Sequence, residues 1–322
     1  MENNNHALFN WIPYRLIEKN DEVYFEWVYL SDLKITDPFF DETIAKCKSH
    51  EYNSKKFKPV SSAENIIQWS SELISVDLKA LVFHVSRCGS TMLSQSLATS
   101  SENIMISEAP IFDEILRSDY FSPDIKAVLI KAVLKFLGQK RFPEQKNLIF
   151  KLDAWHIFKV SYLRKLFPEI PFTLLYRNPV EVLKSHQKLP GLHMVPGLIP
   201  SAVFGIKIQE MQSTHLHQYQ ALVLEKYFKG FLDFFEIDEK VTLLNYNEGM
   251  KGVIEKFISF VKINYSEKEC DKMFERLKRH SKDESAVFTG DSFKEEALNV
   301  DFLKLNRLHE KLNNMFLDSV EL

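Results

Sequence analysis

Residues 86–91 combine residue types that bind anions. Arg87 supplies a fixed positive charge with several hydrogen-bond donors, Gly89 lets the backbone approach a bound group, and two hydroxyl side chains follow. An apolar, β-rich run at 81–85 precedes the turn, and a helix is expected after it. Unpaired N–H groups and the dipole at a helix start favour a negatively charged group. The sequence therefore predicts a phosphate or sulfate site in a strand–loop–helix.

The turn departs from the loops of two common phosphate-handling enzyme classes. An ATP or GTP loop needs Gly, four residues and then Gly-Lys-Ser/Thr, whereas Arg87 and Cys88 stand before Gly89 here. A phosphatase loop pairs a Cys with an Arg six positions later, and the residue six positions after Cys88 is Ser94. Taken alone, the segment also fits an ordinary strand–turn–helix with polar turn residues.

A second candidate anchor follows a predicted strand over 172–176. Arg177 ends the strand, and Asn178-Pro179 opens a helix, since Pro is favoured at the first helical position. Ser185 stands eight positions after Arg177, on the second turn of that helix. We expect the Arg177 side chain to meet the Ser185 hydroxyl, so that the pair holds a second phosphate. A helix with an N-terminal Pro and an exposed Ser is the plain alternative.

The composition bounds the class of protein. A chain of 322 residues, 45% of them hydrophobic, can form one large domain or two smaller ones. A net charge of −3 gives no support to a nucleic-acid partner. The three cysteines are few and widely spaced, without zinc-like spacing, and no signal peptide or membrane span is visible. We therefore expect a cytoplasmic protein without disulfides.

The hydrophobic pattern divides the chain near residue 76. Residues 1–75 are predicted to form a β-rich appendage, with strands at 12–17 and 23–29, a short helix after Asp37-Pro38 and a polar loop over 48–62. Residues 76–322 are predicted to form an α/β domain of P-loop type, whose mainly parallel sheet has helices on both faces. Its strands are expected at 80–85, 103–106, 147–152, 171–176 and 240–245. Its helices are expected at 90–100, 109–118, 123–138, 156–167, 179–188, 203–230, 248–263, 267–279 and about 293–317.

Taken together, the two anchors resemble the sulfotransferase family that uses 3′-phosphoadenosine 5′-phosphosulfate (PAPS). There, a loop of the form Arg/Lys-Ser-Gly-Ser/Thr-Thr holds the 5′-phosphosulfate, and Arg-Asn/Asp-Pro with a Ser eight residues on holds the 3′-phosphate. The loop reads Arg87-Cys88-Gly89-Ser90-Thr91 here, and the second anchor matches in register. The resemblance spans roughly residues 80–190 and is nearest the carbohydrate, tyrosylprotein and bacterial branches. It implies PAPS as cosubstrate, no metal, and cofactor contacts from Arg87, Cys88, Gly89, Ser90, Thr91, Met92, Arg177 and Ser185.

Cys88 is the departure from the family loop, which has Ser at this position. A small side chain is retained and the anion-binding atoms there are mostly backbone, so binding is expected to survive. A thiol at a helix N-terminus has a lowered pKa. We therefore expect Cys88 to be a reactive thiol whose modification blocks cofactor binding.

Transfer of a sulfuryl group to a hydroxyl or amine needs a general base beside the transferred group. The resemblance implies that Glu108, just after the strand 103–106, is this base, although a carboxylate near a helix start is also explained by the helix dipole. Lys151 matches a family Lys that lies near the sulfate. The following family His is Asp153 here, which leaves Asp153 to orient Lys151 or to act as the alternative base. Arg87 and Lys151 are expected to stabilise charge on the leaving phosphate oxygen.

Two later segments carry weaker signals. The Pro/Gly loop 189–197 is either a lid on the acceptor side or a mere connection. Lys282, in a polar loop that also holds Ser281, Asp283 and residues 288–291, is a candidate contact to the 3′-phosphate, with a solvated Lys as the alternative.

Three functions remain open at this point. The first is a PAPS-dependent sulfotransferase, the second a P-loop nucleotide kinase-like enzyme, and the third a catalytically silent nucleotide-binding protein of the same fold. The missing Gly-Lys-Ser/Thr disfavours the second. The acceptor could be a small molecule, a glycan or a peptide, and the appendage could cap the acceptor side or form a homodimer contact.

Overall fold

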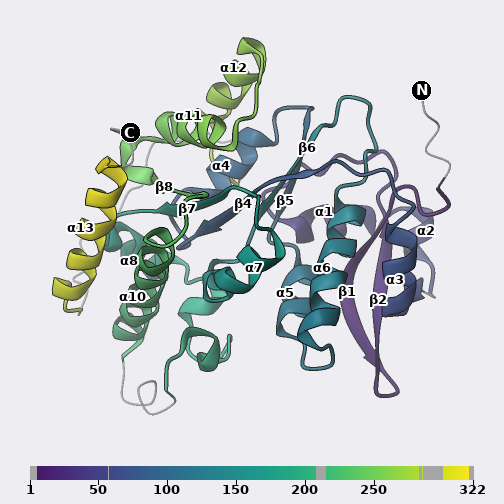
Figure 1. Ribbon diagram of the computed structural model, residues 1–322, viewed down its shortest axis with the longest axis horizontal. Helices are drawn as coiled ribbons and strands as arrows, with labels where there is room; N and C mark the ends of the chain where they lie inside the picture. Colours follow the sequence, from purple (N-terminus) through teal and green to yellow (C-terminus); the bar gives the residue numbers. More distant parts are fainter. Residues whose placement is uncertain (1–5, 57, 208–214, 283–284, 286–299, 319–322) are drawn as a thin grey trace. The chain divides into compact units, whose positions relative to one another are not determined.

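The computed structural model describes residues 6–56, 58–207, 215–282, 285 and 300–318 (Figure 1). Contacts within the chain divide it into two compact units. Unit 1 holds Met1–Ala80, Ser94–Lys151 and Asp271–Arg276. Unit 2 holds Leu81–Leu93, Leu152–Cys270 and Leu277–Leu322.

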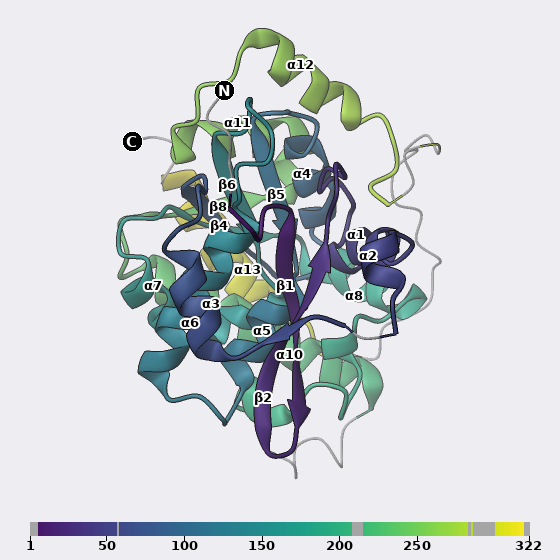
Figure 2. The same cartoon turned by 90° about the vertical axis from the view of Figure 1, so that its right-hand side faces the viewer.

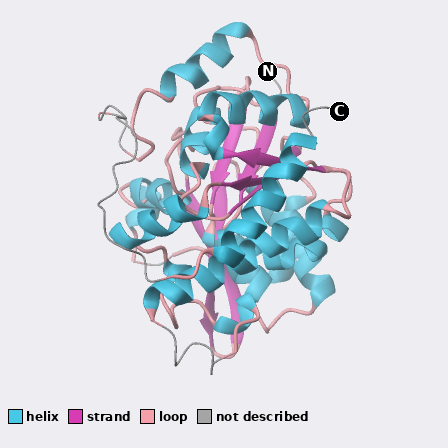
Figure 3. Ribbon diagram, turned by 90° about the vertical axis from the view of Figure 1, so that its left-hand side faces the viewer, coloured by secondary structure: helices cyan, strands magenta, loops and turns pink. Residues whose placement is uncertain are grey.

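A five-stranded sheet carries the predicted α/β architecture. Its hydrogen-bonded order is β5-β6-β4-β7-β8, from strands β4 (Leu78–His84), β5 (Asn103–Ser107), β6 (Asn147–Lys151), β7 (Phe172–Tyr176) and β8 (Val241–Asn245). The pairs β5–β6, β4–β7 and β7–β8 are parallel. The strands are buried along most of their length, as the apolar runs predict for a sheet covered by helices. Helices flank the strands (Figure 3), so the predicted fold class is confirmed.

The N-terminal segment forms its own antiparallel sheet of β1 (Trp11–Lys19), β2 (Glu22–Tyr29) and β3 (Val60–Ser61). The β1–β2 hairpin, seen along its length in Figure 2, turns at Asn20 and Asp21, with φ of 54° and 62°. Positive φ at both central residues is the backbone that a two-residue hairpin turn requires, and Asn and Asp tolerate it. The two predicted strands are confirmed, with longer bounds.

Unit 1 packs this hairpin against helices. These are α1 (Phe40–Cys47), α2 (Glu51–Ser54), α3 (Ala63–Ser70), α5 (Pro110–Arg117) and α6 (Pro123–Leu137). Helix α12 (Glu267–Arg276) begins in unit 2 and ends in unit 1. Strand β1 contacts α5 and α6, and the Trp27 and Phe136 rings meet edge to face at 4.8 Å. The prediction of an unstructured loop over 48–62 is wrong, because this stretch contains α2 and β3. Asn53 fixes α2 by accepting a hydrogen bond from the Tyr29 N–H (2.9 Å) and donating one to the Tyr29 carbonyl (2.7 Å).

Unit 2 surrounds β7 and β8 with α7 (Val160–Leu166), α8 (Pro179–Lys188), α10 (Leu216–Phe235), α11 (Met250–Val261) and α13 (Leu303–Asp318). Its 3-10 turns are η1 (Ala154–Lys159), η2 (Leu192–Met194), η3 (Ser201–Phe204) and η4 (Tyr246–Glu248). Helix α10 contacts α8, α13 and β8. Helix α4 (Ser90–Leu97) begins in this unit and ends in unit 1.

Two helix predictions in unit 2 need comment. The prediction of a single helix over 203–230 is wrong. The 3-10 turn η3 ends at Phe204, and Gly205 follows it with a left-handed φ of 62°. The first residues of the last predicted helix, 293–299, lie outside the described residues, and α13 covers most of the remainder. None of the described helices is long and apolar enough to cross a membrane.

Candidate functional site

The turn between β4 and α4 has an unusual backbone. Ser86 and Arg87 both have positive φ, 67° and 51°, and Gly89 follows at 83°. Left-handed backbone at a non-glycine residue costs about 1–2 kcal/mol, and such residues gather at functional sites. Successive turned peptides of this kind make concave sites that bind anions through backbone N–H groups. Such a backbone suits the predicted anion loop, whose binding role stays a prediction.

His84 holds this turn in place. Its Nδ1 accepts a hydrogen bond from the Ser86 N–H at 3.0 Å, so the ring proton resides on Nε2, which donates to the Leu152 carbonyl at 2.9 Å. The buried ring therefore fixes the left-handed Ser86 and links the end of β4 to the residue that follows β6. Sequence reasoning counted His84 only as part of an apolar strand.

Gly89 is required by its neighbours as well as by its φ. A Cβ at this position would lie 2.5 Å from Tyr246 Cδ2 and 2.9 Å from the Met250 sulfur. Tyr246 begins η4, directly after β8. The Tyr246 ring packs against the anion loop at Gly89, a contact that the spacing of the motif does not predict.

The second anchor lies on the neighbouring strand. Arg177 is 6% exposed, its Nε donates to Glu181 Oε2 at 2.5 Å, and its guanidinium lies over the Tyr246 ring at 4.2 Å. Its Nη1 also donates to the Arg87 carbonyl at 3.3 Å. The structure thus brings the two predicted anchors together within unit 2. Glu181, one helical turn after Arg177, neutralises the buried guanidinium.

Helix α8 begins as predicted. The Asn178 side chain accepts a hydrogen bond from the Val180 N–H at 3.0 Å, which caps the helix before Pro179. Ser185 is half-buried on this helix, and among the described residues its hydroxyl makes no hydrogen bond with Arg177. Arg177 pairs with Glu181, and the shared role of Arg177 and Ser185 toward a phosphate stays a prediction.

The remaining residues of the anion loop line the start of α4. Ser90 and Met92 are buried and Thr91 is half-buried. The Cys88 side chain is fully buried, at 0% exposure. This burial opposes the expectation of a reactive thiol, because thiol reagents must reach the sulfur.

The Arg87 side chain points to the Pro/Gly loop. Its Nη2 donates to the Leu189 carbonyl at 2.5 Å. The loop 189–197 therefore contacts Arg87, a residue predicted to bind the cofactor. Whether the loop is a lid or only a connection stays open.

Glu108 and Lys151 form the second group of predicted residues, in unit 1. Glu108 Oε1 lies 2.8 Å from the Lys151 ammonium, and the Glu108 N–H donates to the Lys151 carbonyl at 2.8 Å. Lys151 is fully buried, with the Phe39 ring centroid 5.1 Å from its nitrogen. Glu108 has φ of 56°, so its backbone is also left-handed. Left-handed backbone at a non-glycine residue is common at functional sites, and the role of Glu108 as a base stays a prediction.

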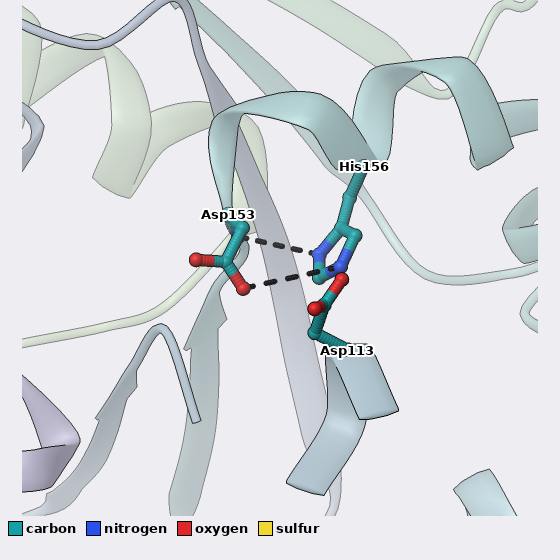
Figure 4. Close-up of side chains that lie close together, drawn as sticks. All are labelled: Asp113, Asp153 and His156. Atoms are coloured by element: carbon teal, nitrogen blue, oxygen red, sulfur yellow. Dashed lines mark hydrogen bonds and ion pairs between the residues drawn. The ribbon is translucent and has the colours of Figure 1, made fainter. Parts of the chain in front are cut away.

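Asp153 has a structural partner in unit 2. It precedes η1 and forms a capping box with His156, whose Nδ1 accepts from the Asp153 N–H at 3.2 Å (Figure 4). The carboxylate lies 3.9 Å from His156 Nε2. Capping accounts for an Asp at this position without a catalytic role.

Lys282 is exposed, and its N–H donates to His280 Nδ1 at 3.3 Å. The rest of the predicted C-terminal loop, at Asp283 and 288–291, lies outside the described residues. The Lys282 contact to a 3′-phosphate stays a prediction.

No protein-family model matches the chain. No curated protein matches it either.

Solved structures do match. The sulfotransferase domain from the curacin biosynthetic pathway has 13% identity and a TM-score of 0.46, and the match covers 74% of this chain and 99% of that one. Sulfotransferase STF9 from Mycobacterium avium has 13% identity, a TM-score of 0.48, and coverage of 80% and 81%. Mouse sulfotransferase SULT7A1, complexed with PAP, has 13% identity, a TM-score of 0.38, and coverage of 80% and 92%. These three proteins are sulfotransferases. Because the likeness is distant and concerns the fold alone, we base the function on the residues of this chain.

Proposed function

We propose that this protein is a sulfotransferase that moves the sulfuryl group of PAPS to an acceptor hydroxyl or amine. The observation that carries the proposal is the pairing of two arginine anchors. Arg177, from the strand next to β4, donates to the carbonyl of Arg87 within a turn whose backbone has positive φ at three of four residues. Two cationic anchors at adjacent strand ends suit a ligand with two separated anionic groups.

The residues around the anchors support a doubly phosphorylated nucleotide. The turn offers backbone N–H groups and the start of α4 to one anion, while the Arg177 guanidinium is fixed by Glu181 and Tyr246. Gly89 gives the turn its positive φ and leaves room for the Tyr246 ring, which lies directly against it. This cradle fits phosphate or phosphosulfate groups.

The proposed chemistry divides between the two groups of residues. When bound, PAPS supplies a sulfuryl group whose transfer breaks the bond between sulfur and a phosphate oxygen. Arg87, Lys151 and the turn N–H groups stabilise the negative charge that develops on that oxygen. Glu108 takes the proton that the attacking hydroxyl or amine loses. Glu108 and Lys151 stand at or near the carboxyl ends of parallel strands in unit 1, and Arg87 and Arg177 follow the ends of parallel strands in unit 2.

Asp153 is the alternative base. Its capping box with His156 gives the carboxylate a structural role, which favours Glu108 as the base.

A cytoplasmic location stays a prediction.

Thermal unfolding with added nucleotides tests the proposal. Adenosine 3′,5′-bisphosphate should raise the melting temperature, whereas ATP with magnesium should not. Stabilisation by ATP–magnesium alone would reverse the proposal in favour of a kinase-like enzyme. Bisphosphate binding without any transfer from labelled PAPS to the molecules of a cell extract would indicate a silent nucleotide-binding protein.

A further inference from the structure

A cluster of buried polar side chains in unit 2 has no role in the proposed chemistry. We call it the buried polar cluster: His186 on α8, His193 on η2, and Tyr219, Gln220 and Tyr227 on α10. Each is at most 5% exposed. The ring centroids of His186 and His193 lie 5.6 Å apart, and those of His193 and Tyr227 lie 5.7 Å apart. Gln220 Nε2 donates to the carbonyl of Met194, the neighbour of His193, at 3.5 Å.

Four atoms of the cluster have no hydrogen-bond partner. They are His186 Nε2, Tyr219 Oη, Gln220 Oε1 and Tyr227 Oη. Buried polar groups in folded proteins are nearly always paired, so a group of four such atoms calls for an explanation. A bound polar molecule would supply the missing partners.

The hydrogen-bond roles of these atoms are determined by their neighbours. The Gly191 N–H donates to His186 Nδ1 at 3.2 Å, so the neutral ring carries its proton on Nε2 and offers a donor there. The Gln220 amide nitrogen is engaged with Met194, which leaves the oxygen as an acceptor. The tyrosine hydroxyls can donate or accept. A hydroxyl group, which also donates and accepts, is the complement of this set.

The side chains of His186, Tyr219, Gln220 and Tyr227 carry no formal charge. Burial, with help from His193 and Arg87, lowers the pKa of His186 to about 2, so its ring is neutral at physiological pH. Burial also raises the pKa of Tyr219 and Tyr227. These neutral side chains offer hydrogen bonds but no charge of their own, so a charged ligand would be desolvated among them at a cost. The cluster therefore selects a neutral ligand.

Aromatic rings surround the polar atoms. Phe158 stacks on the Tyr227 ring at 5.4 Å, Phe204 meets it at 6.3 Å, and the Trp155 ring lies 6.0 Å from His193. These rings would contact an apolar part of a ligand.

The cluster adjoins the anion loop. Arg87 acts electrostatically on His186, and Arg87 also binds the carbonyl of Leu189, in the loop that carries Gly191 and His193. Asp153 acts in the same way on Tyr227. A molecule bound at the cluster would thus lie beside a residue proposed to hold the phosphosulfate.

We propose that the buried polar cluster is the acceptor subsite and that it takes a neutral alcohol with an apolar ring or chain. The proposal rests on the proposed sulfotransferase function for its biological meaning, but not for the binding it asserts. Loop 189–197 supplies His193 to the cluster and also contacts it through Gly191 and Met194.

Four small probes of similar size test the proposal with the full chain: benzyl alcohol, benzoate, benzylamine and toluene. Saturation-transfer NMR should detect benzyl alcohol binding, and the two charged probes and toluene should bind at least about fivefold more weakly, since each lacks the hydroxyl or carries charge. Equal binding of all four, or no binding of benzyl alcohol, would overturn the proposal.

A double variant, Tyr219→Phe with Tyr227→Phe, removes two unpaired hydroxyls and keeps the rings. Benzyl alcohol should bind it about tenfold more weakly, while the affinity for adenosine 3′,5′-bisphosphate should not change. Tyr162→Phe, which removes a phenol on α7, is the control. If the double variant were merely more stable and bound benzyl alcohol as the parent does, the cluster would be only an internal polar core. If benzyl alcohol bound at the cluster but the bisphosphate bound nowhere, the subsite would stand and the sulfotransferase proposal would fail.

Discussion

The guanidinium of Arg177 lies 4.2 Å above the ring of Tyr246, and the edge of that ring faces Gly89 of the anion loop. One aromatic side chain therefore positions an anchor from β7 and limits the residue type in the turn after β4. The cation–π contact and the Glu181 carboxylate together hold a buried guanidinium in one orientation.

Replacing Arg177 with Lys should weaken nucleotide binding. A Lys keeps the charge but loses the planar fork that pairs with Glu181 and phosphate oxygens. We expect adenosine 3′,5′-bisphosphate to bind the variant about 10- to 100-fold more weakly by calorimetry, from the loss of about 1.5–3 kcal/mol of charged hydrogen bonding. Arg164→Lys is the matched control, because Arg164 also pairs with a carboxylate (Asp238, 2.6 Å) and lies over a ring (Phe172, 3.7 Å). Equal weakening in both variants would contradict an anchoring role for Arg177.

Two glycine variants separate strain from steric clash in the anion loop. Gly89 and Gly249 have similar φ, 83° and 88°, but a Cβ at Gly249 would meet nothing within 4 Å. Gly249→Ala should therefore cost only the backbone strain, about 1–3 kcal/mol of unfolding free energy, because residues other than glycine rarely adopt φ 88° with ψ 143°. Gly89→Ala should cost more, since its Cβ would collide with the Tyr246 ring. Urea unfolding measures both, and equal losses would show that Tyr246 can move aside freely.

The local parts of the fold follow from the sequence. Apolar runs and turn residues predict all five strands of the parallel sheet to within two residues. The helix start at Asn178-Pro179 follows from capping rules in the same way. Such features depend on neighbours within a few residues of one another.

Other features depend on contacts between distant parts of the chain. The hydrogen bonds between Asn53 and Tyr29 fix the short helix α2, which no local sequence pattern predicts. His84 belongs to a predicted strand, and Tyr246 follows another. Only the fold shows that both side chains contact the anion loop. The Arg177 side chain pairs with the charged Glu181, one helical turn away, and the spacing of the second anchor does not predict this ion pair.

Glu108→Gln should separate catalysis from binding. The amide keeps the shape of the side chain but cannot accept the acceptor's proton, so turnover should fall by at least about 10²-fold. Affinity for adenosine 3′,5′-bisphosphate should stay near the parent value. Asp153→Asn is the comparison: it should keep the helix cap, since Asn caps as well as Asp, and leave turnover largely intact. Persistent turnover in Glu108→Gln and its loss in Asp153→Asn would make Asp153 the base.

The cysteines should differ in their reaction with Ellman's reagent. Cys47 and Cys88 are buried, and burial raises the pKa of the Cys47 thiol to about 11, whereas Cys270 is half-exposed. We expect the native protein to react quickly at Cys270 only, and Cys270→Ser to remove that fast phase. Cys88→Ser should bind the bisphosphate like the parent. If Cys88 were labelled quickly and the bisphosphate prevented this labelling, the original hypothesis of a reactive thiol at Cys88 would be correct.

His186 should make the protein less stable as pH falls. Burial, with His193 and Arg87, lowers its pKa in the folded protein to about 2, while an unfolded His titrates near 6.5. Below about pH 6.5 the unfolded chain therefore binds a proton that the folded ring refuses, and folding loses about 1.4 kcal/mol per pH unit from this group. Asn in place of His186 removes the titrating ring. Between pH 7.5 and 5.5, urea unfolding should show the parent losing about 1.4 kcal/mol more than His186→Asn. The exposed His215→Asn should follow the parent, and a parent and His186→Asn that change in parallel would mean that the ring takes up its proton in the folded state.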